Sequence, residues 1–200
     1  MPKLLTTAVL AAALAFPAAA RAQPVVGVRL GWAVPAGQLR GGLDLGQYVA
    51  GVATVEVEAG WRLWRGLTLG GTASYGVARV DTYLGNLYEA QGDSTSGSVL
   101  QLGLRGEWTF RDLAAGILPW VALGAGWQRL DLSIGSDFTY FGWNLVRLEA
   151  GADWAAGRGF TVGPYASWSL GRYTKLGSGA ISQQAGHAWA AFGLRGNWGP

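Results

Sequence analysis

Hydrophobic and polar residues alternate one by one through most of the chain after residue 23. In the segment 98–110, mainly Leu, Trp and Phe occupy every second position, and the positions between them include Gln101, Arg105 and Glu107. A helix would mix these two sets around its circumference, whereas a β-strand places them on opposite faces. The alternation recurs between turn residues and predicts eight strands, near 25–34, 54–64, 67–79, 98–110, 120–130, 144–155, 160–172 and 188–198.

The connections between these strands alternate in length. Those after the second, fourth and sixth strands are short or moderate, at 65–66, 111–118 and 157–159. Those after the first, third, fifth and seventh strands are longer and more polar, at 35–51, 81–97, 132–142 and 174–186. Short turns on the periplasmic side and long loops outside are typical of a membrane barrel, so we expect both chain ends in the periplasm.

The polar face of these strands consists mainly of Gly, Ser and Thr, and Lys175 is the only lysine after residue 22. Charged residues make up 14% of the chain, against roughly 25% in an ordinary soluble domain. We therefore predict an all-β, eight-stranded, antiparallel up-and-down transmembrane barrel, with apolar side chains facing lipid. The alternative is a soluble periplasmic lipid-binding barrel with the opposite sidedness, in which Arg105 and Arg195 would face solvent.

Aromatic residues cluster towards the ends of the apolar strand faces. A packed core would not sort tryptophan in this way, but interfacial girdles of a membrane barrel do. Tyr75 and Tyr173 are expected in the same girdles. The tryptophans assigned to the girdles are Trp32, Trp61, Trp108, Trp120, Trp127, Trp154 and Trp198.

Ten charged residues share the opposite face and are predicted to line the lumen. Their charges sum to zero, and mutual pairing is expected because an unpaired charge in a narrow interior is costly. The interior of an eight-stranded barrel is just wide enough to be filled by side chains, so we expect a plugged lumen. A small-solute channel is the alternative. The predicted network comprises Arg29, Glu56, Glu58, Arg62, Arg105, Glu107, Arg147, Glu149, Asp153 and Arg195.

Residues 1–22 have the features of a signal peptide, and residues 23–200 are expected to form the barrel domain. Lys3 precedes an apolar stretch, and Ala20-Arg21-Ala22 provides a small-x-small cleavage site before Gln23. Pro17 interrupts the apolar stretch, which is too short for a spanning helix of about 20 residues.

Residues able to perform catalysis or bind a metal are few. The chain contains no cysteine and one histidine, His187, so we predict no catalytic, cofactor-binding or metal-binding residues. Asp93-Ser94 could approach His187 only through folding of a long loop. Because the balance of basic and acidic residues after residue 22 is nearly even, no nucleic acid is expected as a partner.

Three segments carry a resemblance to a known family: Gly193-Leu194-Arg195-Gly196-Asn197-Trp198, Pro119–Trp127 and Val162-Gly163-Pro164-Tyr165. With them, the chain resembles the outer-membrane β-barrel proteins typified by the OmpA transmembrane domain, OmpX and the opacity proteins of Gram-negative bacteria. Many such barrels end in an aromatic residue, whereas Trp198 is followed here by Gly199-Pro200.

The resemblance implies an integral protein of the cell outer membrane. It implies outer-membrane lipids as partners, and periplasmic chaperones and the barrel-assembly machinery during biogenesis. A non-enzymatic role in envelope structure or surface interaction is expected, with aromatic residues in loop segments 43–48, 83–88 and 138–143 as candidate contacts for an extracellular ligand. Because some small barrels are lipid A deacylases or acyltransferases, a lipid-modifying enzyme that uses His187 is the alternative.

Overall fold

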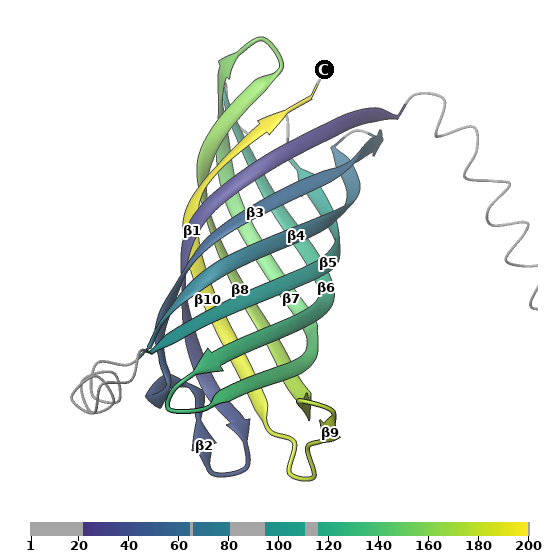
Figure 1. Cartoon of the computed structure of the whole chain (residues 1–200). Helices are drawn as coiled ribbons and strands as arrows, with labels where there is room; N and C mark the ends of the chain where they lie inside the picture. The colour runs from purple at the N-terminus through teal and green to yellow at the C-terminus, as the bar shows by residue number, and fades with distance from the viewer. Residues whose placement is uncertain (1–21, 65, 81–94, 111–115, 200) are drawn as a thin grey trace, which may run out of the picture.

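The computed structural model describes residues 22–64, 66–80, 95–110 and 116–199. Eight long antiparallel strands run up and down and form a closed barrel (Figure 1). They are β1 (Gln23–Arg40), β3 (Val49–Trp64), β4 (Leu67–Val80), β5 (Ser96–Thr109), β6 (Ile117–Ser133), β7 (Asp137–Gly157), β8 (Phe160–Leu176) and β10 (Gly186–Trp198). The predicted fold class is confirmed.

Each strand pairs with its neighbours in the sequence, and β10 closes the barrel by pairing with β1. Val26 of β1, for example, lies opposite Trp198 of β10 and Ala59 of β3. Each of these eight strands therefore has a partner on both sides, and none of the long strands in the described ranges is an unpaired edge.

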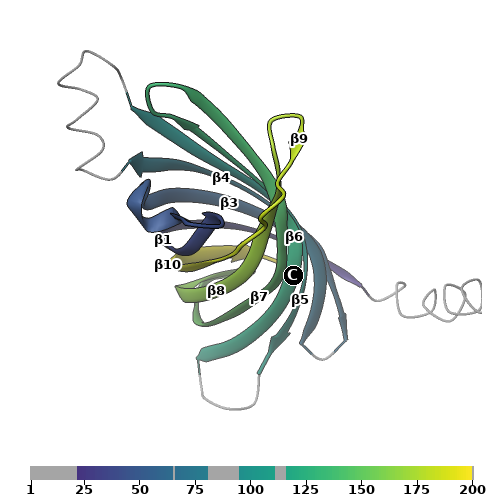
Figure 2. The ribbon, with the colours of Figure 1, turned by 90° about the horizontal axis from the view of Figure 1, so that it is seen from below.

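The two ends of the barrel differ in their connections. The turn end carries the tight connections between β3 and β4 and between β7 and β8, together with the C-terminal end of the described chain (Figure 1). The loop end carries the strands β2 (Leu43–Asp44) and β9 (Gly179–Ala180) and the 3-10 helix η1 (Leu45–Gln47). Figure 2 views the barrel from the loop end, where the connection that contains β9 projects. Among the described residues no helix is long and apolar enough to cross a membrane.

Several strands extend further towards the loop end than the sequence pattern predicts. The expected loop 132–142 is wrong: β6 continues to Ser133 and β7 starts at Asp137, so only Ile134–Ser136 connect them. The strand ladder continues there because inward-facing apolar residues such as Leu130 and Tyr140 become buried. The signal-peptide prediction for 1–21, and the loop residues 81–94 and 111–115, lie outside the described residues.

The sidedness of the barrel is the reverse of that of a soluble protein. Leu104 is 76% exposed on the outer face, and Leu30, Leu123, Phe192 and Leu194 are also exposed there. Arg105 and Arg195 are buried inside. The alternative of a soluble barrel with Arg105 and Arg195 facing solvent is therefore wrong.

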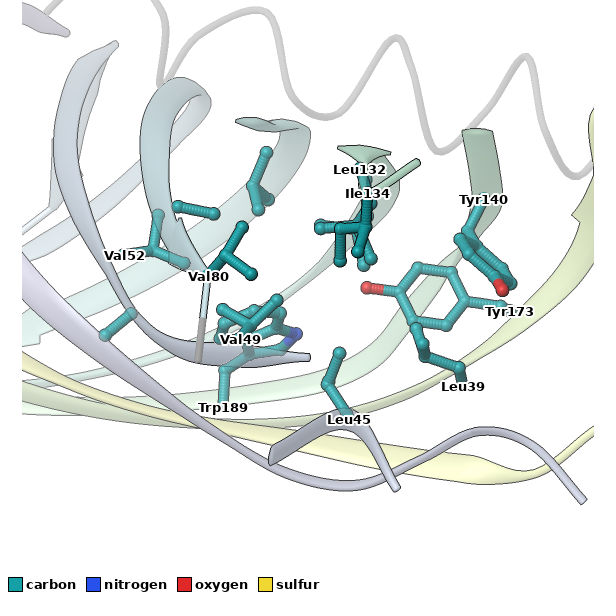
Figure 3. Packing of buried hydrophobic residues seen from close by; sticks show 14 of the residues in the cluster. Leu39, Leu45, Val49, Val52, Val80, Leu132, Ile134, Tyr140, Tyr173 and Trp189 are labelled. Carbon is teal, nitrogen blue, oxygen red and sulfur yellow. The ribbon is translucent and has the colours of Figure 1, made fainter. Parts of the chain in front are cut away.

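The interior changes from charged to hydrophobic along the barrel axis. Towards the loop end, residues from several strands and from η1 point to one another and form a hydrophobic cluster (Figure 3). The sequence pattern did not predict this cluster. Its larger members are Leu39, Leu45, Val49, Val52, Val80, Leu130, Leu132, Ile134, Tyr140, Tyr173, Ile181 and Trp189.

Candidate functional site: a charged lumen beneath a hydrophobic cluster

Strands β1, β3, β5, β7 and β10 supply the charged side chains inside the barrel. Because side chains alternate between the two faces of a strand, charged residues two positions apart project into the same interior. Inward positions are small along most of β4, as at Ser74, and at Ala122, Gly124 and Gly126 of β6. Small residues on these strands leave room for the long side chains of the others.

Arg29 lies at the centre of the charged lumen and is completely buried. Its guanidinium approaches three carboxylates: Glu58 at 2.7 Å, Glu149 at 2.9 Å and Glu56 at 3.3 Å. The three acids come from β3 and β7, which are not neighbours in the sheet. Arg29 therefore connects two strands of the barrel wall that do not pair with each other.

Two further arginines extend the network towards the turn end. Arg105 contacts Glu58 at 2.6 Å and Glu107 at 2.7 Å. Arg195 contacts Glu107 at 2.6 Å and Asp153 at 2.7 Å. Since Glu58 is shared with Arg29 and Glu107 is shared by Arg105 and Arg195, the ion pairs form one continuous network.

Arg147 completes the network on the other side of Arg29. Its guanidinium lies 2.6 Å from Glu56 and 2.7 Å from Glu149. The tenth predicted lumen residue, Arg62, is half-buried at the turn end of β3, in register with Gln23 and Thr68. The ion pairs from Arg29 to Arg195 thus join Arg29, Glu56, Glu58, Arg105, Glu107, Arg147, Glu149, Asp153 and Arg195 into one set.

Trp120 lies inside this network, so its assignment to an interfacial girdle is wrong. Its side chain is 1% exposed, and its indole N–H donates to the Asp153 carboxylate at 3.1 Å. The guanidinium of Arg195 lies 3.6 Å from the ring centroid, and those of Arg29 and Arg105 lie at 5.4 and 5.5 Å. These distances are in the range of cation–π interactions, so the Trp120 ring interacts with all three guanidinium groups.

Glycine makes room for the network at the barrel wall. A Cβ atom at Gly27 would lie 2.5 Å from Glu58 Oε1 and 2.6 Å from Glu58 Cγ. At Gly31 it would collide with the hydroxyl of Tyr165, whose ring lies 5.1 Å from the Arg29 guanidinium. Both glycines therefore leave lumen volume that a larger neighbour fills.

The other predicted girdle tryptophans lie on the outer face. Trp61, Trp108, Trp154 and Trp198 are exposed towards the turn end, whereas Trp32 and Trp127 are partly exposed further along the barrel. Tyr75 is also exposed outside. Tyr173 is completely buried inside the barrel, so its girdle assignment is wrong. Trp120 shares the strand parity of the inward-facing residues of β6, and this alternation distinguishes it from the outer tryptophans. The girdle assignment rests on the preference of tryptophan for membrane interfaces and does not use the alternation.

Polar groups lie where the charged network meets the hydrophobic cluster. The Gln128 side-chain amide donates to the Tyr173 hydroxyl at 2.6 Å, and the ring of His187 stacks on Tyr173 at 4.2 Å. His187 is 2% exposed, and neither ring nitrogen has a hydrogen-bond partner in the structure. His187 therefore lies within the barrel, buried against Tyr173.

Small cavities lie beside the charged network inside the barrel. Two cavities of about 20 Å³ each lie beside the network. One is lined by Glu58 and Arg105, the other by Arg147 and Glu149. Each has room for about one water molecule. Within the described ranges, no group of three or more His, Cys, Asp or Glu residues is arranged to hold a metal ion.

Comparison with known proteins adds to this geometry. No protein-family model matches the sequence, and no curated protein matches it. Two solved structures are similar: Neisserial surface protein A, with 13% identity over 86% of this chain and 95% of that chain and a TM-score of 0.52, and the outer membrane protein OprG from Pseudomonas aeruginosa, with 10% identity over 90% and 96% and a TM-score of 0.54.

At these identities the likeness concerns the fold. The chain thus has an eight-stranded β-barrel fold like that of these two proteins.

Proposed function

We propose that this protein is an integral, non-enzymatic barrel of the outer membrane, with a closed lumen and a structural or surface-interaction role. The observation that carries the proposal is the position of the ion-pair network, which spans the lumen from Arg29 to Arg195 and is covered by the hydrophobic cluster. A conducting pore needs a continuous water-filled path, and both layers oppose one.

The two layers close the lumen by different means. In the charged layer, Arg29 and Trp120 occupy the interior, and the adjoining cavities are about 20 Å³. In the hydrophobic layer, Leu45 from η1 belongs to the same buried cluster as Leu39 and Val49. An ion entering from either end would have to displace packed side chains.

The proposed orientation has the turn end in the periplasm and the loop end outside the cell. Three of the four loop-end connections are longer than any turn-end connection. This difference supports the orientation, because outer-membrane barrels have short periplasmic turns and longer extracellular loops. Both termini would then be periplasmic. During biogenesis, periplasmic chaperones and the barrel-assembly machinery would be its partners.

The loop end offers a candidate surface for an extracellular ligand. A groove of about 570 Å³ is lined by residues of the first and last loops, including Arg40, Leu43 and Gln183. The Gly41 N–H donates to the Gln183 carbonyl at 3.0 Å and connects the two loops. A polar groove held by a backbone hydrogen bond can recognise a ligand without a large rearrangement.

The environment of His187 supports a role other than catalysis. Its ring is buried against Tyr173, and within the described residues no Ser, Asp or Glu side chain hydrogen-bonds to it. A general base must lie within hydrogen-bond reach of the proton that it abstracts. Asp93-Ser94 lies outside the described residues.

Planar-bilayer recording of the purified protein tests the closed lumen. We expect no large, stable conductance, with a porin as the positive control for insertion and recording. Stable openings from most inserted molecules would contradict the closed lumen and support the small-solute channel.

Substitution of His187 by alanine tests the enzymatic alternative. We expect cells that produce the His187→Ala variant, the wild-type protein or neither to have the same lipid A species by mass spectrometry. A lipid A species that depends on the wild-type protein and disappears with His187→Ala would contradict the non-enzymatic proposal. Gel mobility of the folded variant controls for loss of the barrel.

A further inference from the structure

Basic and aromatic side chains form an ordered patch on the outer face of β6, β7 and β8. In one row across the strands, Phe141 lies in register with Arg129 on one side and Lys175 on the other. In the next row, Trp143 lies in register with Trp127 and Arg172. We call these six residues the basic patch.

Contacts within the basic patch hold part of it in place. The Phe141 ring stacks on Trp127, with centroids 6.0 Å apart, and the Arg129 guanidinium lies 5.7 Å from the Phe141 ring. Asp131 pairs with Arg129 at 2.9 Å, and Asp137 is a second acidic residue in the groove beside Arg129. Arg172 and Lys175 are exposed, and neither forms an ion pair with any residue that the structure describes.

The basic patch lies at the boundary of the apolar outer face. On β8, outward positions from Val162 to Leu170 are apolar and exposed, and Arg172 is the next outward residue. On β7, the exposed Leu145 and Val146 follow Trp143 on the side of the turn end. The basic side chains therefore lie just beyond the apolar outer face, on the side of the loop end.

We propose that the basic patch binds the phosphorylated headgroup of an anionic glycolipid in the outer leaflet. Arg172 and Lys175 would contact the phosphate, Trp143 would lie at headgroup level, and acyl chains would cover Leu145, Val146 and Leu170. The inference rests on the proposed membrane location, and it adds a defined lipid-binding site to the barrel.

The chemistry of the patch matches that of a lipid phosphate. Arginine can form two parallel hydrogen bonds with a phosphate, and lysine adds a compact positive charge. Tryptophan is favoured at the membrane interface, where one part of the ring is apolar and the N–H can reach water or a headgroup. Beside Arg129, a groove of about 520 Å³ lined by Ser98, Asp131 and Thr139 provides polar groups for sugar hydroxyls.

Lipid titration by native mass spectrometry tests the inference. The folded protein in detergent is mixed with bisphosphorylated lipid A, or with the same lipid after removal of both phosphates. We expect Arg172→Gln and Lys175→Gln to weaken binding of the phosphorylated lipid about fivefold each, and the double variant about 25-fold. The matched control is Arg158→Gln, which removes an exposed arginine at the turn end and should leave binding unchanged.

Three outcomes would overturn the inference. The double variant could bind phosphorylated lipid A as tightly as the wild type does, dephosphorylated lipid A could bind equally well, or excess inorganic phosphate alone could displace the lipid completely. The last result would indicate a site for free phosphate. Since every variant is first checked for its folded gel mobility, these outcomes are distinct from failure of the barrel proposal, in which no folded, detergent-dependent form is obtained.

Discussion

Replacement of Arg29 by methionine is expected to lower the free energy of unfolding by about 3–5 kcal/mol, the range for breaking a buried ion pair from one side. Arg29 is completely buried and lies within 3.3 Å of Glu56, Glu58 and Glu149. Methionine retains an unbranched apolar stem like that of arginine but carries no guanidinium, so the three carboxylates would lose their shared cation. Urea titration of the vesicle-inserted protein, followed by gel mobility, measures the change.

Two further variants test whether the loss of stability comes from the unpaired carboxylates. Arg158→Met removes an exposed arginine at the turn end and should change stability by less than about 0.5 kcal/mol. Arg29→Met combined with Glu149→Gln restores the balance of charge and should recover part of the loss. A loss below about 1 kcal/mol for Arg29→Met alone would contradict a tightly packed, dry network.

The second large effect is expected on the outer face of the barrel. Leu104→Arg should lower the free energy of unfolding in a membrane by about 2–4 kcal/mol. Leu104 is 76% exposed on β5, midway along an apolar outer face. If that face contacted water, an arginine at so exposed a position would change stability by less than about 0.5 kcal/mol. Urea titration in vesicles therefore distinguishes lipid from water at this residue.

Ser98→Arg is the matched control for Leu104→Arg. Ser98 lies on the same strand and the same face, six residues nearer the loop end, in register with Val77 and Asp131. The cost of an arginine falls to about 0–1 kcal/mol near the interface. If Leu104→Arg and Ser98→Arg lowered the free energy of unfolding equally, this would contradict the placement of Leu104 near the middle of the membrane and of Ser98 near its surface.

The period of two in the sequence was sufficient to predict the eight strands and their sidedness. Residues such as Arg105 and Glu107 occupy one parity of β5 and Leu104 the other, and this separation depends only on local backbone geometry. It also identified the charged residues that the structure brings together. Which arginine meets which carboxylate could not be predicted, because Arg29 and Glu149 are 120 residues apart and meet only across the closed barrel.

The two aromatic errors have a common cause. Trp120 and Tyr173 lie on the inward parity of β6 and β8, yet they were grouped with the girdle residues because tryptophan and tyrosine favour membrane interfaces. In the structure, Trp120 contacts three arginines and Tyr173 accepts a hydrogen bond from Gln128. Where residue type and strand parity disagree, parity is the better guide in this barrel.

The hydrophobic cluster at the loop end was missed for a different reason. On β6, inward positions change from Gln128 to Leu130 and Leu132, so the same parity is polar in one half and apolar in the other. The rule that polar residues face the lumen does not hold beyond Gln128. Because the alternation of polar and apolar residues is lost there, the sequence pattern predicts a loop at 132–142. The strands continue beyond the apolar band because their inner face acquires a core of its own.

Electrophoretic mobility of the detergent-purified protein, unboiled and boiled, tests the central claim most directly. A closed membrane barrel leaves no strand edge to fray and stays folded in the detergent of the gel until it is heated. We predict a clear shift on boiling, with the protein recovered in the outer-membrane fraction. A protein that shows no shift and is soluble without detergent would contradict the membrane barrel, because the exposed Leu, Val and Trp face would then have to be buried.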